Sequence, residues 1–368
     1  MSDRAAFLQS ILRTDLAGFI ETCFATLEPG TPYRDNWHMH AIAYQLMRVR
    51  NGECKRLIIN VPPRSCKSIA VTIGFTAWLM GHDPRKRIMA ISYANDLARK
   101  HAIDFRTIVG SAWYKALFPG FEATSVRETE LTTSRHGYRF AGSIGGSVLG
   151  RGADLIVIDD PIKGLAAALS QAERRRVAEF YDSTLYSRLS DKVNGAIVIV
   201  MQRLHQDDLV GHVLDKEDWE VLSIPAIAPD DSHIRVGSAK DAVIHRRAGD
   251  VLHPEREPAE WLEAARRNLG SLNFSAQYQQ NPLPAEGNVI RREWLKTYDH
   301  LPVAFDLKIV SWDTASTLGE ASDWSVGMVW GAVGQEYYLI DVVRDRLESP
   351  DLRRRILALS RDYRADAT

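Results

Sequence analysis

Residues 57–68 read LIINVPPRSCKS, and this stretch decides the fold of the chain. It opens with an apolar run, and an apolar, helix-like segment from Ile69 to Met80 follows it. The order is therefore strand, loop and helix, with Lys67 and Ser68 where the helix starts. A helix N-terminus presents free N–H groups and the positive end of its dipole, which favours a phosphate. The Lys67 ammonium can reach the terminal phosphates of a nucleotide there, and the Ser68 hydroxyl can ligate Mg²⁺.

A second stretch, LIVIDDP at residues 155–161, complements the first. It is an apolar strand that ends in two carboxylates, as a Walker B strand does. In that arrangement Asp159 holds Mg²⁺ and Asp160 orients the attacking water. The two stretches together predict a P-loop NTPase site that binds ATP and Mg²⁺.

The loop departs from the P-loop consensus, which has glycine at the positions of Val61 and Cys66. Glycine permits positive φ and a close approach of the backbone to phosphate, whereas Cys66 brings a Cβ into that space. The two prolines of the loop lack N–H donors. A thiol at a helix N-terminus beside Lys67 predicts a lowered pKa and a reactive cysteine. By the consensus alone, a proline-bounded turn before a helix is the alternative interpretation.

Length and composition set the broad class. A chain of 368 residues predicts two domains, and 45% hydrophobic with 25% charged residues is typical of a soluble globular protein. The net charge of −1 means that any contact with nucleic acid has to come from local basic patches. The three cysteines have no metal-binding spacing, which fits a reducing cytosol. No apolar run is long enough to cross a membrane.

The pattern of apolar runs predicts an α/β fold in two parts. Strands and helices alternate in the first part, which predicts a doubly wound, mainly parallel sheet over residues 1–285, with a lid or linker region at about 225–285. A Pro- and Gly-containing break predicts a linker at 286–300. Residues 301–368 then predict three strands and a helix, with an Asp at the end of the first strand. That order is how an RNase H-like nuclease domain begins, and we expect this domain to be incomplete.

The sequence resembles the large subunit of tailed-phage terminases over nearly its whole length. Each matching segment is short, and their order and spacing together carry the resemblance. The segments are WHMH (37–40), VPPRSCKS (61–68), GGSVLGRGAD (145–154), LIVIDDP (155–161), MQRLHQDDL (201–209), FSAQYQQNP (274–282) and SWDTA (311–315).

The resemblance implies a motor that uses ATP to move viral DNA into a procapsid. In that family a packaging ATPase is joined to an RNase H-like endonuclease, which cuts concatemeric DNA with two metal ions. The implied partners are double-stranded viral DNA, the portal protein, the terminase small subunit and further copies of the chain in a ring, without a membrane. The implied location is the cytoplasm of the bacterial host, with transient association with the procapsid.

Roles at the nucleotide site follow from the same resemblance. Lys67 would hold the β- and γ-phosphates, and Ser68 and Asp159 would hold Mg²⁺. Asp160 would be the catalytic base, at a position where the family often has Glu. The residues that would bind the nucleotide are Arg64, Ser65, Cys66, Lys67, Ser68, Gln45 and Gln202.

Further roles lie outside the two stretches. Arg151 is in a Gly-rich turn eight residues before Asp159 and resembles the trans-acting arginine finger of some terminases. A loop arginine that faces solvent or DNA is the alternative. Gln202 and Arg203 resemble the coupling motif that senses the γ-phosphate. Gln45 would contact adenine, and a solvated glutamine on a helix is the alternative.

The nuclease part carries fewer ligands. Asp313 would be the first catalytic metal ligand for Mn²⁺ or Mg²⁺, and Asp341 and Asp323 are further candidates. Asp341 sits at a strand position whose side chain can point elsewhere. Two-metal cleavage needs several carboxylates around the ions, and we expect the later ones to lie beyond Thr368. We therefore do not expect efficient cleavage by this chain.

Two other functions stay open at this point. One is a helicase-like or other DNA-translocating P-loop ATPase, which would share the two nucleotide-binding stretches. The other is an inactive prophage remnant that only binds DNA or portal protein. The sequence leaves open which phage or host is concerned, whether cutting is cohesive-end or headful, and the stoichiometry of the ring.

Overall fold

The computed structural model describes residues 3–148, 150–283, 296–314, 324–334, 336–345, 347 and 349–368, with side chains from Gln9 onward. The chain forms two compact units, Met1–Asn288 and Val289–Thr368. Most of the predicted linker at 286–300 lies outside the described residues. No helix in the described part of the chain has the length and apolar character needed to cross a membrane.

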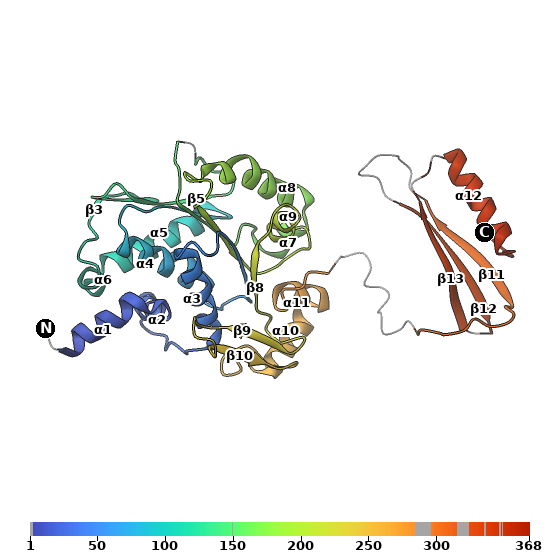
Figure 1. The fold of residues 1–368 in the computed structure, drawn as a ribbon, viewed down its shortest axis with the longest axis horizontal. Helices are drawn as coiled ribbons and strands as arrows, with labels where there is room; N and C mark the ends of the chain where they lie inside the picture. Colours follow the sequence, from blue (N-terminus) through green and yellow to red (C-terminus); the bar gives the residue numbers. More distant parts are fainter. Residues whose placement is uncertain are drawn as a thin grey trace. The chain divides into compact units, whose positions relative to one another are not determined.

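The first unit is built on an eight-stranded sheet in the order β3-β4-β5-β2-β6-β7-β1-β8 (Figure 1). Neighbouring strands from β5 to β8 pair in parallel, whereas β3, β4 and β5 pair antiparallel. This confirms the predicted mainly parallel sheet. The strands are β1 Arg56–Asn60, β2 Arg87–Ser92, β3 Ala123–Val126, β4 Glu130–Thr133, β5 Tyr138–Ser143, β6 Leu155–Asp159, β7 Ala196–Met201 and β8 Glu220–Ser223.

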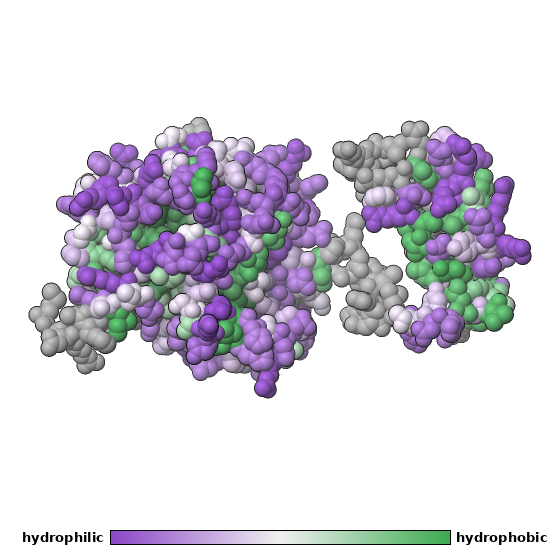
Figure 2. Space-filling view, viewed as in Figure 1, coloured by the Kyte–Doolittle hydropathy of each residue, from purple (hydrophilic) through white to green (hydrophobic). Residues whose placement is uncertain are grey.

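Helices cover both faces of this sheet, as the continuous apolar runs of its central strands require. One face packs against residues of α2, α3, α4, α5 and α6 in one buried cluster, and the other packs against α7, α8 and α9 in a second cluster. Figure 2 shows that the visible surface of this unit is mostly hydrophilic, with apolar residues in small patches. The helices are α1 Asp3–Thr14, α2 Leu16–Leu27, α3 Trp37–Arg50, α4 Thr76–His82, α5 Asn95–Gly110, α6 Ala112–Leu117, α7 Gly164–Leu169, α8 Gln171–Phe180 and α9 Leu209–Leu214.

Several helices differ from the sequence expectation in their winding or length. The segment after the phosphate-binding loop is π-helical over Ile69–Phe75 (η1) before α4 continues it. The long helix expected from Asn95 is broken at Ser111, whose Oγ accepts from the Tyr114 N–H and so caps α6. The helix expected after Ser170 ends as a π-helical turn, Tyr181–Leu185 (η2), and a 3₁₀ turn, Tyr186–Arg188 (η3).

Residues after β8 form a smaller layer on the first unit. A β-hairpin pairs β9 Ser232–Arg235 with β10 Val243–Arg246, and two helices follow, α10 Ala259–Leu269 and α11 Ser271–Gln277. A small buried cluster of Ala226, Leu262 and Phe274 holds the helices together. These elements lie within the region expected to form a lid.

The second unit has three antiparallel strands in the order β11-β12-β13 and one helix. They are β11 Leu307–Asp313, β12 Ser325–Val333, β13 Glu336–Asp345 and α12 Ser349–Asp362. Leu359 of α12 packs on Val310 and Val329 of the sheet. The chain after α12 lies parallel to β11, where the Val310 N–H donates to the Ala367 carbonyl at 2.9 Å. Strand, strand, strand and helix is the order expected for this region.

Candidate nucleotide and metal site

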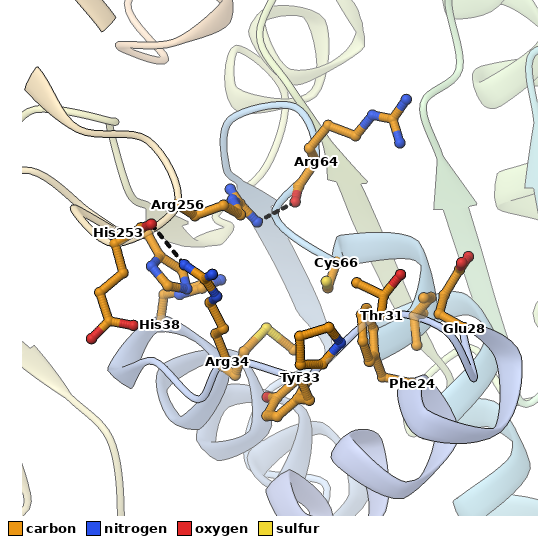
Figure 3. A pocket seen from close by; sticks show the side chains of 14 residues that line it. Phe24, Glu28, Thr31, Tyr33, Arg34, His38, Arg64, Cys66, His253 and Arg256 are labelled. Atoms are coloured by element: carbon orange, nitrogen blue, oxygen red, sulfur yellow. Dashed lines mark hydrogen bonds between the residues drawn. The ribbon is translucent and has the colours of Figure 1, made fainter. Parts of the chain in front are cut away.

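The loop between β1 and η1 holds two residues with left-handed backbone, Arg64 at φ 63° and Cys66 at φ 56°. Such a conformation costs a residue with a Cβ about 1–2 kcal/mol. Contacts on each side hold it: the buried Ser65 Oγ donates to the Pro62 carbonyl at 2.8 Å, and Arg256 donates to the Arg64 carbonyl (Figure 3). The loop therefore adopts a glycine-type backbone without glycine, and Ser65 supports the loop with its own side chain.

The structure brings four predicted site residues together at the carboxyl end of the sheet. Ser68 Oγ donates to Asp159 Oδ1 at 3.1 Å, and Lys67 Nζ lies 3.0 Å from Asp160 Oδ2. Lys67 and Ser68 come from the loop after β1, and the two acids come from the end of β6. These strands are not neighbours, since β7 lies between them in the sheet.

Asp159 is completely buried, and hydroxyls surround it. Thr72 Oγ1 donates to Asp159 Oδ2 at 2.6 Å, on the other carboxylate oxygen from Ser68. Burial raises the pKa of Asp159 in spite of these hydrogen bonds. His101 Nε2 is 3.8 Å away, but burial lowers the pKa of His101 to about 4, so the imidazole is neutral at pH 7.

A hydroxyl and a carboxylate on one edge suit a hard divalent cation such as Mg²⁺, which takes oxygen ligands. The Ser68 and Asp159 oxygens are the pair that would hold it. A cation beside Asp159 would also neutralise a carboxylate that burial otherwise disfavours in its charged form. The residues present therefore fit the metal that the two sequence stretches predict.

Asp160 faces the same place from the next position along the chain. Its backbone is left-handed at φ 43°, and its Oδ1 accepts from the Gln202 N–H at 3.3 Å. Burial raises the pKa of Asp160, while the Lys67 charge opposes the rise. A carboxylate with a raised pKa at the edge of a phosphate site has the properties of a general base.

Gln202 and Arg203 follow β7, yet only Gln202 reaches this cluster. The Gln202 side chain accepts from Gln277 Nε2 of α11 at 3.1 Å. Arg203 Nε instead lies 3.0 and 2.9 Å from the two carboxylate oxygens of Asp208, which is fully buried. Sequence reasoning missed Asp208 as the partner that holds Arg203, although the Asp lies only five residues further on.

Two predicted residues lie away from the cluster. Arg151 Nε pairs with Glu130 Oε2 at 2.8 Å, and its guanidinium lies 4.3 Å above the Phe140 ring. Gln45 accepts from Arg48 Nη1 at 3.0 Å and lines a surface pocket of its own beside β8. Leu149, in the Gly-rich turn before Arg151, lies outside the described residues.

A cavity of about 630 Å³ opens beside the phosphate-binding loop (Figure 3). Sequence reasoning assigned most of its wall no role, because the wall comes from separated segments with ordinary local sequence. The buried His38 Nδ1 and Arg256 Nε have no hydrogen-bond partner among the described residues. The wall includes Phe24, Tyr33, Arg34, His38, Arg64, Cys66, His253 and Arg256.

Cys66 differs from its predicted chemistry. Burial raises the pKa of the Cys66 thiol, although the Arg256 charge acts in the opposite direction. The expected lowering of this pKa is therefore wrong, because burial among the apolar residues of the wall outweighs the positive end of the helix.

The two predicted metal ligands of the second unit are not brought together. Asp313 pairs with Val326, which pairs with Arg344, so these three side chains share one face of the sheet. Asp341 is three residues from Arg344 and points to the other face, where Tyr363 of α12 donates to its Oδ2 at 2.7 Å. Asp341 therefore does not fit a shared metal site with Asp313.

Further acids near Asp313 cannot be assigned from the described part of the chain. Asp323, like Ala315, lies outside the described residues. Among the described residues no group of three or more His, Cys, Asp or Glu is arranged to hold a metal ion.

Comparison with known proteins identifies the relatives of this chain. The family model described as "Terminase large subunit, T4likevirus-type, N-terminal" matches residues 58–297, well over half of the chain. No curated protein matches. Similar solved structures include the large terminase of bacteriophage HK97 (14% identity, 97% of this chain and 74% of that chain, TM-score 0.46). Others are the ATPase domain of the Thermus phage P74-26 large terminase (14%, 71% and 97%, 0.43) and the large terminase of a thermophilic bacteriophage in complex with ADP (11%, 86% and 73%, 0.39).

Proposed function

This chain belongs to the terminase large subunit family, and we propose that it is an ATP-hydrolysing motor that moves double-stranded viral DNA into a procapsid. The observation that carries the proposal is the convergence of Lys67, Ser68, Asp159 and Asp160 within hydrogen-bonding distance of one another. Phosphoryl transfer to water needs these kinds of group in one place: a cation for the phosphates, oxygen ligands for the metal and a base.

In the proposed complex the phosphates lie on the Lys67 ammonium and on the N–H groups at the start of η1. Ser68 and Asp159 hold Mg²⁺. The base occupies the cavity beside the loop, where the orphan polar atoms of His38 and Arg256 supply partners. Gln45 is seven residues beyond His38 on α3, about 10 Å further along a helix, so we assign the base to the cavity and not to Gln45.

Hydrolysis in this proposal is in-line attack by water on the γ-phosphate. Asp160 accepts a proton from the attacking water, and Lys67 stabilises charge on the phosphoryl oxygens. Gln202, which contacts Asp160 through its N–H, carries a change at the phosphate to the Gln277 side chain of α11. We propose that Arg203 supports this connection through Asp208.

The remaining roles rest on the family alone. We propose that Arg151 acts on the nucleotide of a neighbouring copy in a ring, and that portal protein, terminase small subunit and viral DNA are partners in the bacterial cytoplasm and on the procapsid. Binding of DNA then depends on phosphate contacts, which are sensitive to salt. Asp313 is proposed as the first ligand of a metal-dependent endonuclease in the second unit, and Asp341 is left out.

The test is ATP hydrolysis by wild type and Lys67→Ala, with and without double-stranded DNA. We expect Lys67→Ala to lose about 10²–10³-fold in kcat, because a donor to the phosphoryl oxygens is removed. The fold should persist, since Lys67 lies on a loop. Lys192→Ala is the matched control, because Lys192 is an exposed lysine whose described hydrogen bond goes to the Ser187 carbonyl.

The outcomes separate the possible functions. Equal hydrolysis by wild type and Lys67→Ala would refute the site. A wild-type protein that binds DNA but hydrolyses no ATP would point to an inactive remnant. Hydrolysis with unwinding of DNA strands, and no dependence on portal, would favour a helicase-like ATPase.

A further inference from the structure

The helix after the phosphate-binding loop is wound in an uncommon way, and one buried arginine holds it there. Residues Ile69–Phe75 are π-helical, a winding that is rare and occurs mostly at functional sites. Arg139 of β5 is only 2% exposed and reaches this segment from the neighbouring strand layer. Its Nη2 donates to the Thr72 carbonyl at 3.0 Å, and its Nε donates to Thr76 Oγ1 at 3.3 Å.

Arg139 is an expensive residue for this position. Its described partners are neutral: a carbonyl, a hydroxyl and the Phe105 ring, whose centroid is 4.6 Å from the guanidinium. Burial lowers the pKa of Arg139 to about 9, so the side chain is still charged at pH 7. A well-packed apolar residue often stabilises a core position at least as well as a buried charge. Stability of the fold alone therefore does not account for an arginine here.

The contacts of Arg139 end on the residue that supports Asp159. The Thr72 carbonyl accepts from Arg139, and the Thr72 hydroxyl donates to Asp159 Oδ2 at 2.6 Å. Ser68, four residues earlier, donates to Asp159 Oδ1 at 3.1 Å. The winding of η1 thus determines whether both hydroxyls can reach one carboxylate, and Arg139 fixes the winding at Thr72.

Gly74 is a second, independent sign that this winding is built into the sequence. A Cβ added at Gly74 would come within 2.9 Å of the Ile69 carbonyl oxygen, closer than real Cβ contacts. The residue at the end of the wide turn therefore has to be glycine for the turn to keep its present form. Arg139 from one side and Gly74 from within hold the same segment.

We propose that Arg139 is a positioning residue for ATP hydrolysis, which holds η1 in its π-helical winding so that Ser68 and Thr72 together orient Asp159. The inference rests on the proposed function and adds to it a residue far from the nucleotide. Arg139 touches neither phosphate nor base in this arrangement. Its loss should therefore change kcat and the Mg²⁺ dependence, and leave the affinity for ATP.

The experiment compares wild type, Arg139→Lys and Arg139→Met in the full chain. It measures kcat, KM for ATP, the Mg²⁺ concentration at half-maximal rate, and hydrogen–deuterium exchange of the peptide that spans residues 69–76. We expect kcat to fall about tenfold or more in Arg139→Met, because misplacement of a metal ligand by a fraction of an ångström is costly. Arg139→Lys should lose less, since an ammonium can still donate to the Thr72 carbonyl.

In the same variants KM for ATP should stay within about twofold, since the loop and the cavity are unchanged. Half-maximal Mg²⁺ should rise and exchange over residues 69–76 should speed up. Gly74→Ala should reproduce these changes without altering Arg139. If Arg139→Met folds as a stably compact protein with wild-type kcat and Mg²⁺ dependence, the proposal is wrong.

Arg246 is the matched control. It is also a buried arginine (3% exposed) with a lowered pKa of about 10, and it also donates to backbone carbonyls, those of Pro225, Ala226 and Asp250. Arg246→Met should destabilise the fold and leave kcat and half-maximal Mg²⁺ unchanged per folded molecule. Equal losses in both arginine variants would mean that Arg139 acts only through stability, which overturns the inference alone. Absence of ATP hydrolysis by wild type would overturn the proposed function as well.

Discussion

A residue with a Cβ in left-handed backbone carries a conformational cost, and the phosphate-binding loop carries it at Cys66. The loop keeps this backbone because its neighbours are fixed: the Cys66 carbonyl accepts from the Ala70 N–H at 2.9 Å, and Ser65 is tied to Pro62. What replaces glycine here is a set of contacts, so the loss of one contact should matter more than it would in a glycine loop.

The cost at Cys66 can be measured with two variants that both lack the thiol. We expect Cys66→Gly to be more stable than Cys66→Ala by up to about 1 kcal/mol, because only alanine keeps the left-handed penalty of about 1–2 kcal/mol. Urea unfolding of both variants gives the difference. Ala264→Gly, within α10, is the control and should show the opposite sign, a loss of about 1 kcal/mol. Greater stability of Cys66→Ala would show that the loop is not strained.

His38 makes stability depend on pH. Burial, then the charges of Arg256 and His253, lower the pKa of His38 to about 3. Between that pH and the ordinary value near 6.5, the unfolded chain binds more protons than the folded one, so stability rises with pH. The contribution is complete above pH 6.5 and is lost as pH falls towards 3. It amounts to about 2 kcal/mol between pH 6.5 and 5.

Urea unfolding of wild type and His38→Gln at pH 5 and pH 7 checks this prediction. Other groups that titrate in this range contribute equally to both proteins, so the difference between them isolates His38. We expect the wild type to lose more stability at pH 5 than the variant does. Parallel losses in the two proteins would show that His38 is protonated inside the fold.

At the scale of elements, α9 begins where one buried acid satisfies several donors. Asp208 is fully buried and accepts from the N–H groups of Val210 and Gly211 as well as from Arg203. Asp208→Ala should cost about 3–5 kcal/mol, because it removes the cap and leaves the Arg203 charge without its partner. Asp208→Asn should cost less, since an amide oxygen can still accept from the two N–H groups.

Thermal or urea unfolding of the two variants measures the effect of Asp208. Asp191→Ala is the control, because Asp191 accepts from two N–H groups in the same way but lies in an exposed turn. We expect a clearly smaller loss for it. Similar losses at both positions would mean that the Arg203 pair adds nothing beyond the cap.

The elements that the sequence predicts best are those with a local cause. The apolar runs at 57–61, 155–159 and 196–201 are strands, because residues buried on both faces of a parallel sheet have to be continuously apolar. The π-helical winding of η1 is different, since it depends on Arg139, which lies more than sixty residues away. Nothing in the apolar stretch from Ile69 to Met80 reports that contact.

The site divides in the same way. Lys67, Ser68, Asp159 and Asp160 could be predicted because two motifs place them at the carboxyl ends of strands. The cavity wall could not, since Phe24, His38 and Arg256 meet only after α2, α3 and the layer after β10 have packed together. Cys66 shows the limit inside a motif, because the burial that raises its pKa comes from those same distant segments.

At the scale of the molecule, the first unit contains every described contact of the nucleotide site. The two core clusters that support the sheet also lie within it. The second unit has its own small core around Val310, Val329 and Leu359. Each unit therefore has what an independent domain needs, a separate hydrophobic core.

A chain that comprises residues 1–288 should consequently fold and hydrolyse ATP by itself. We expect kcat without DNA within about twofold of the full chain and the same apparent melting temperature for the main transition, because no described contact of Lys67, Asp159 or the cavity comes from the second unit. Asp313→Ala in the full chain is the companion variant and should leave ATP hydrolysis unchanged. Activity and melting are measured on the three proteins side by side. A shortened chain that folds but loses nucleotide affinity would mean that the second unit takes part in the ATP site, and one that fails to fold would show that the two cores are not independent.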